Sequence, residues 1–79
     1  MDTNFFLILG RDENGEFEFL GDLTLMGDGN AVVNNDYDGT GNQYFDNHKD
    51  ALDYIKGRIC DNPVYYDPVV NQLASIRVL

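Results

Sequence analysis

The chain has 79 residues, with 14 Asp or Glu against 5 Lys or Arg and a formal net charge of −9. This length allows a single domain, residues 1–79, with one small core, and the 43% of hydrophobic residues are too many for a disordered chain. The acidity excludes direct nucleic-acid binding of the usual kind, because the surface would repel a phosphate backbone.

The cysteine content and the N-terminal residues indicate the compartment. Cys60 is the single cysteine, so the chain has no internal disulfide, which a secreted domain of this size would normally need. Asp2 stands where a signal peptide carries positive charge, and the apolar run at residues 5–9 is too short for a signal peptide or a membrane span. We therefore expect a cytoplasmic protein without membrane association.

The first half of the chain predicts an antiparallel meander of three strands. Residues 4–11 form an apolar run that ends in turn residues, as in a buried strand, and the Asn-Gly pair after it predicts a hairpin. Residues 16–20 alternate with a period of two. This alternation places two phenylalanines on the core face and two glutamates on the exposed face, namely Phe17 and Phe19 against Glu16 and Glu18. Residues 23–25 continue it, and residues 31–33 form the third strand after a turn.

The second half predicts one helix and a C-terminal strand. Residues 34–43 are rich in Asn, Asp and Gly and are expected to form a loop. A helix begins near Asp46 or Asn47 and ends before residues 61–63. Its apolar stripe consists of Ala51, Leu52, Ile55 and Ile59. Residues 73–79 alternate as a last strand, with Ala74, Ile76 and Val78 facing one way. The fold class is therefore α+β with the order βββαβ, and Leu52 and Ile55 are expected to pack on Phe17 and Phe19.

Residues for catalysis are scarce, and no cofactor is expected. His48 is expected to be exposed at the helix start, without a nucleophile beside it. Cys60 follows the helix, where the helix dipole disfavours a thiolate. We expect a chain that is not an enzyme.

One loop offers weak candidate metal ligands. Residues 34–42 resemble the first half of an EF-hand calcium loop, with Asn34, Asp36 and Asp38 at alternate positions and Gly39 at the turn. The twelfth position, which needs a bidentate Glu, is Phe45. An ordinary turn rich in Asn and Asp is the alternative interpretation.

The placement of charge is the most informative feature. Between positions 12 and 48 there are nine acidic residues and no Lys or Arg. Tyrosines among such charges are typical of protein-binding surfaces, and rows of carboxylates can imitate phosphates. The bland alternative is an acidic surface that only keeps the protein soluble. The candidate partner-binding residues are Glu16, Glu18, Asp22, Asp36, Asp38, Asp46, Asp50, Asp53, Tyr37 and Tyr44.

In size, acidity, lack of catalytic residues and expected fold, the chain resembles the small acidic inhibitors that phages and mobile elements use against host defence. Anti-CRISPR proteins are the best example, and the resemblance spans the whole chain but rests on no sequence motif. It implies binding to a CRISPR effector, at its basic nucleic-acid groove or at another part, which would block target DNA. For a phage-encoded chain the compartment would be the host cytoplasm.

We therefore predict a non-enzymatic inhibitor that acts as a nucleic-acid mimic on a basic surface of a nucleic-acid-handling complex. Two alternatives stay open. One is a calcium-responsive or structural module that uses Asn34, Asp36 and Asp38. The other is a subunit of a hetero-oligomer or a homodimer, whose acidity serves only solubility.

Overall fold

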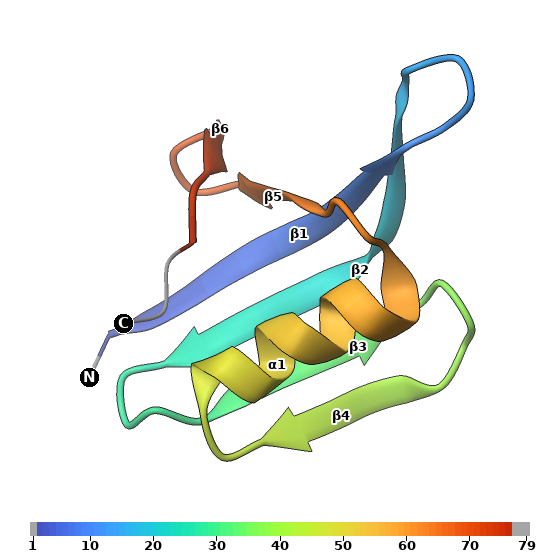
Figure 1. The fold of residues 1–79 in the computed structure, drawn as a ribbon. Coiled ribbons are helices and arrows are strands. Elements are labelled where there is room, and N and C mark those ends of the chain that lie inside the picture. The colour runs from blue at the N-terminus through green and yellow to red at the C-terminus, as the bar shows by residue number, and fades with distance from the viewer. Residues whose placement is uncertain (1, 77–79) are drawn as a thin grey trace.

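The computed structural model describes residues 2–76 as a six-stranded antiparallel sheet with one helix on it (Figure 1). The strands are β1 (Thr3–Arg11), β2 (Phe17–Met26), β3 (Ala31–Asn35), β4 (Gly41–Phe45), β5 (Val64–Asp67) and β6 (Gln72–Ala74). The helix, α1 (His48–Tyr54), continues directly into a π-helical segment, η1 (Ile55–Ile59). The spatial order of the strands is β4-β3-β2-β1-β5-β6. The expected α+β class is confirmed, whereas the expected number and order of strands are not.

The helix begins where the sequence predicts and covers one face of the sheet. The Asn47 side chain accepts a hydrogen bond of 2.8 Å from the backbone N–H of Asp50, which satisfies a free donor of the first turn. The helix then lies across β3 and β4 (Figure 1). Ile55 is fully buried beneath it, as expected, and Leu52 is half-buried against the same core.

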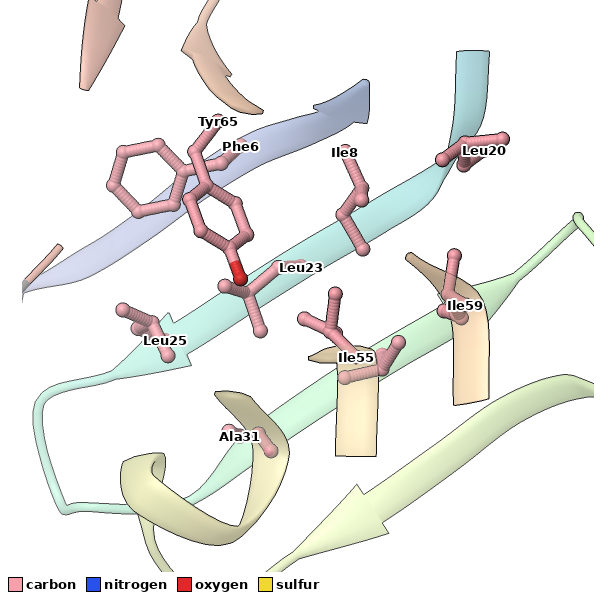
Figure 2. Close-up of a cluster of buried hydrophobic side chains, with 11 residues drawn as sticks. Phe6, Ile8, Leu20, Leu23, Leu25, Ala31, Ile55, Ile59 and Tyr65 are labelled. Atoms are coloured by element: carbon pink, nitrogen blue, oxygen red, sulfur yellow. The ribbon is translucent and has the colours of Figure 1, made fainter. Parts of the chain in front are cut away.

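The core lies between the helix and the sheet, as Figure 2 shows. It contains residues from β1, β2, β3, β5 and both helical segments. These residues are Phe6, Ile8, Leu20, Leu23, Leu25, Ala31, Val33, Ala51, Ile55, Ile59 and Tyr65. The opposite face of the sheet, which we call the open face, has no helix over it in the part of the chain that the structure describes.

The prediction that Phe17 and Phe19 belong to the core is wrong. Their side chains are 46% and 51% exposed, and they lie on the open face. The cause is a β-bulge, because the pairing of β1 with β2 shifts between Ile8 and Leu9 and Gly21 takes a φ of 151°. One extra residue reverses the alternation, so Leu20 is buried instead.

Two strands were not predicted. Residues 34–43 were expected to form a loop, yet β4 begins at Gly41 and pairs with β3 along its whole length. The segment between the two prolines forms β5, which pairs with β1. Both strands contain polar or turn-forming residues with low strand propensity. They form because pairing with a neighbouring strand outweighs that low propensity.

The C-terminal strand is shorter than expected. β6 covers only Gln72–Ala74, and residues 77–79 of the expected strand lie outside the described residues. Ala74 and Ile76 are half-buried and pack against the core, as the alternation predicts.

Candidate partner-binding surface

Half of the candidate partner-binding residues gather at one end of the sheet. Because neighbouring strands are antiparallel, the β1–β2 and β3–β4 connections lie at the same end (Figure 1). Glu16 and Glu18 belong to the first connection and its flank. Asp36, Tyr37 and Asp38 belong to the second connection. All five residues are exposed when backbone and side chain are taken together.

Within this group, Asp38 already has close partners. Its carboxylate accepts hydrogen bonds of 2.8 Å from the Thr40 hydroxyl and 2.8 Å from Arg58 Nε. The Thr40 hydroxyl and then the Arg58 guanidinium hold the pKa of the Asp38 carboxyl below its usual range. The other acids of this end form no side-chain ion pair within residues 2–76, so they present their charge to solvent more freely.

The predicted acidic row Asp46, Asp50 and Asp53 lies elsewhere. The β4–α1 connection is at the opposite end of the sheet, and Asp53 lies in the middle of the helical segments. Asp53 is bound by Lys49 Nζ at 2.7 Å, and this contact raises the pKa of Lys49. The Lys49 ammonium therefore offsets the negative charge of Asp53 in this predicted row.

The two remaining candidates lie on the open face. Asp22 is opposite Leu7 of β1, is half-buried, and accepts a hydrogen bond of 3.3 Å from Asn34 Nδ2. Tyr44 lies on the edge strand β4 opposite Val32 and is 75% exposed. The ten predicted residues are thus divided among the two ends of the sheet, the helix and the open face.

The weak metal candidates do not converge. Asn34 points its amide toward Asp22 on β2, while Asp38 is bound by Arg58. Within residues 2–76 there is no group of three or more His, Cys, Asp or Glu side chains that could hold a metal ion.

His48 and Cys60 flank the helical segments at opposite ends. The expectation that His48 is exposed is wrong, because the residue is half-buried with its Nε2 3.0 Å from the Met26 carbonyl oxygen. Cys60 is also half-buried. The structure therefore does not bring these two side chains together.

The open face carries the surface that sequence reasoning missed. The described chain exposes eight large hydrophobic residues, and five of them lie on this face by strand register, the other three being Tyr37, Val69 and Val70. The five are Phe5, Phe17, Phe19, Tyr44 and Leu73. A sequence signal existed, because β1 is apolar at consecutive positions and so needs cover on both faces, while the sequence predicts only one helix.

Most of the described cations lie away from this face. Of the four Lys and Arg residues in the described range, three lie on the helical segments, on the other side of the sheet. They are Lys49, Lys56 and Arg58. The fourth, Arg11, is held over the Phe17 ring at 4.2 Å and donates a hydrogen bond to the Gly15 carbonyl. The turns that border the open face instead carry carboxylates.

Within the described part of the chain, no helix is long and apolar enough to cross a membrane. Comparison of the chain with family models, with curated proteins and with solved structures found no match.

Proposed function

We propose that this protein is a non-enzymatic inhibitor that binds the basic, nucleic-acid-binding surface of an effector complex, as anti-CRISPR-type proteins do. The observation that carries the proposal is the exposed acidic end of the sheet, where Glu16, Glu18 and Asp36 form no side-chain ion pair with another of residues 2–76. Carboxylates border the open face and the hairpin end, while three of the four described cations lie on the helix side.

Such an arrangement supports inhibition by occupancy. The acidic end is attracted to the cationic groove that normally holds phosphates, which accelerates association. Exposed aromatic side chains then lose contact with water at the interface, which slows dissociation. Nucleic acid and this protein would then compete for one surface, and no reaction is required.

Competition on purified complexes tests this function. A panel of CRISPR effector complexes, each loaded with guide RNA, is incubated with the protein before labelled target DNA is added. We expect the protein to prevent DNA binding by at least one effector, and pre-bound DNA to prevent binding of the protein. Simultaneous occupancy of an effector by both, or undisturbed DNA binding across the panel, would overturn the proposal.

The dependence of inhibition on salt concentration gives a second readout. An interface dominated by opposite charges weakens as ionic strength rises, because exposed charges more than about 10 Å apart are largely screened at 0.1 M salt. Inhibition should therefore decline steadily between low and high salt. Inhibition that is independent of salt would show that the acidic residues do not drive recognition.

A further inference from the structure

The open face of the sheet contains a continuous apolar patch across three strands. Leu9 of β1 lies between Phe19 of β2 and Val64 of β5, and Leu7 lies beside Tyr66 of β5. Directly opposite residues on neighbouring strands point to the same face and touch. With Phe17 added on β2, we call these six residues the open-face patch.

The patch is exposed in spite of its composition. Phe17 and Phe19 are about half exposed, at 46% and 51%, and the remaining members are half-buried. Water-exposed apolar surface that is contiguous over several strands marks an interaction site, because a soluble domain gains nothing by leaving it uncovered.

One aromatic ring of the patch is held in place before any partner arrives. The Arg11 guanidinium stacks over the Phe17 ring at 4.2 Å, and Nη1 of Arg11 is fixed by a hydrogen bond of 2.8 Å to the Gly15 carbonyl. Such a ring loses little conformational freedom on binding, so it suits an anchor in an interface.

We propose that the open-face patch is the contact surface for a partner protein whose own surface is apolar at the centre and bordered by Lys and Arg. The charge around the patch selects this occupant. Glu13 and Glu16 lie in the β1–β2 turn, and Asp22 lies on the open face opposite Leu7. These carboxylates complement a cationic border.

The same charges disfavour the other occupants. Two copies of this chain, each with a net charge of −9, would bring acidic borders together, and among residues 2–76 Arg11 is the one cation on each open face to offset them. An anionic lipid surface would be repelled in the same way. The inference rests on the proposed function for the partner's basic character, but it locates the contact independently of any effector.

A designed peptide tests the patch without an effector. The probe is a synthetic amphipathic helix with Leu on one face and Lys on the other, compared with a peptide of equal length and charge in which Ser replaces Leu. We expect saturable binding of the Leu/Lys peptide, with the NMR signals of the Leu7 and Leu9 methyls and of the Phe17 and Phe19 rings shifting together.

Two double variants sharpen the result. Phe17→Ser with Phe19→Ser removes the aromatic anchors and should weaken peptide binding at least about tenfold. Val69→Ser with Val70→Ser removes two exposed apolar residues from the β5–β6 turn and should leave binding unchanged. If the first variant does not fold, as judged by circular dichroism, Phe19→Ser alone keeps the Arg11–Phe17 contact and should weaken binding several-fold.

Three results would overturn the inference. They are equal binding of the Ser/Lys peptide, shifts confined to the acidic turns, and a dimer in sedimentation that dissociates in the Phe17→Ser/Phe19→Ser variant. The outcomes also separate the two proposals. Effector inhibition that survives the Phe17 and Phe19 changes refutes the patch alone, and peptide binding at the patch without inhibition of any effector refutes the proposed function alone.

Discussion

Gly21 on β2 lies so close to Asn34 on β3 that a Cβ atom at position 21 would collide with the Asn34 carbonyl oxygen. Its φ of 151° is also one that residues with side chains rarely adopt. These two constraints fix glycine at the bulge that turns Phe17 and Phe19 onto the open face.

The Gly21→Ala substitution should therefore destabilise the fold by more than about 3 kcal/mol, from the clash and the strained backbone together. Gly57→Ala is the matched control, because nothing lies within 4 Å of a Cβ at position 57 in the helical segment. That change should raise stability by about 0.5–1 kcal/mol through the better helix propensity of Ala. Urea unfolding measures both. Similar effects of the two substitutions would contradict the bulge geometry.

The bulge also shows where sequence reasoning ended. The Asn-Gly hairpin, the third strand and the helix follow from local patterns, and the structure has all three. The bulge is marked only by Leu20 and Gly21, which interrupt the alternation of residues 17–25, and a glycine inside a strand suggests a bulge without showing that the two faces exchange there. The exposure of Glu16 and Glu18 could be predicted, whereas the exposure of the phenylalanines beside them could not.

The position of the acidic residues relative to the cations could not be predicted from the sequence either. Sequence spacing correctly locates acidic residues in the meander and its loops, but it does not say which face of the sheet the helix covers. That choice places Arg58 beside Asp38 of the β3–β4 turn and leaves Lys49 beside Asp53 of the helix. It follows from long-range packing of Ile55 and Ile59 on the sheet, which no local window contains.

Ile55 should dominate the stability of the helix. Its side chain is fully buried, so Ile55→Ala removes core volume and should cost about 2–5 kcal/mol in the free energy of unfolding. Asp53→Ala, two positions earlier, removes only an exposed contact with Lys49 and should hardly move the melting temperature. Thermal unfolding followed by circular dichroism compares them, and equal small shifts would show that the core does not depend on this face of the helix.

Tyr65 should limit stability at high pH. Its hydroxyl is buried without a hydrogen-bond partner among residues 2–76, and burial, with a smaller effect of Cys60, raises the pKa of Tyr65 to about 12. A pKa raised above the unfolded value near 10 means that the stability from the neutral phenol is complete below pH 10. It is lost as the pH rises from about 10 to about 12.

Tyr65→Phe removes both the unpaired hydroxyl and its titration. We expect the variant to be more stable by about 1 kcal/mol at neutral pH, since a buried unpaired hydroxyl is costly. The advantage over the wild type should grow between pH 10 and pH 12. Tyr66→Phe, on the open face of the same strand, is the control for the aromatic exchange. An unchanged difference across this pH range would contradict the buried environment of Tyr65.

Calcium should have no specific effect on the fold. Asp38 is engaged by Arg58 and Thr40, and the position for a bidentate Glu is Phe45. Calcium and magnesium at about 1 mM should therefore shift the melting temperature equally, through general screening of the acidic chain. A saturable effect of calcium alone that Asp36→Ala abolishes would restore the metal-binding alternative.

Charge reversal at the hairpin end tests whether the location of the acids matters. Glu16→Lys with Glu18→Lys places two cations at exposed positions of the hairpin end, and folding should survive because exposed charges contribute little to stability. Asp46→Lys with Asp53→Lys makes the same change in net charge at the far end of the sheet and on the helix. Association with an inhibited effector, followed by surface plasmon resonance across a salt series, should slow about tenfold or more for the first variant.

The second variant should slow association far less, because its charges lie away from the contact. If the association rate falls equally for both variants, only the net charge accelerates association, and the acidic end has no special role. If neither loses any rate at low salt, the acidity of the chain serves solubility, and the effector is recognised through other groups. A loss confined to the first variant, which disappears at high salt, is the result that links the hairpin end to a cationic groove.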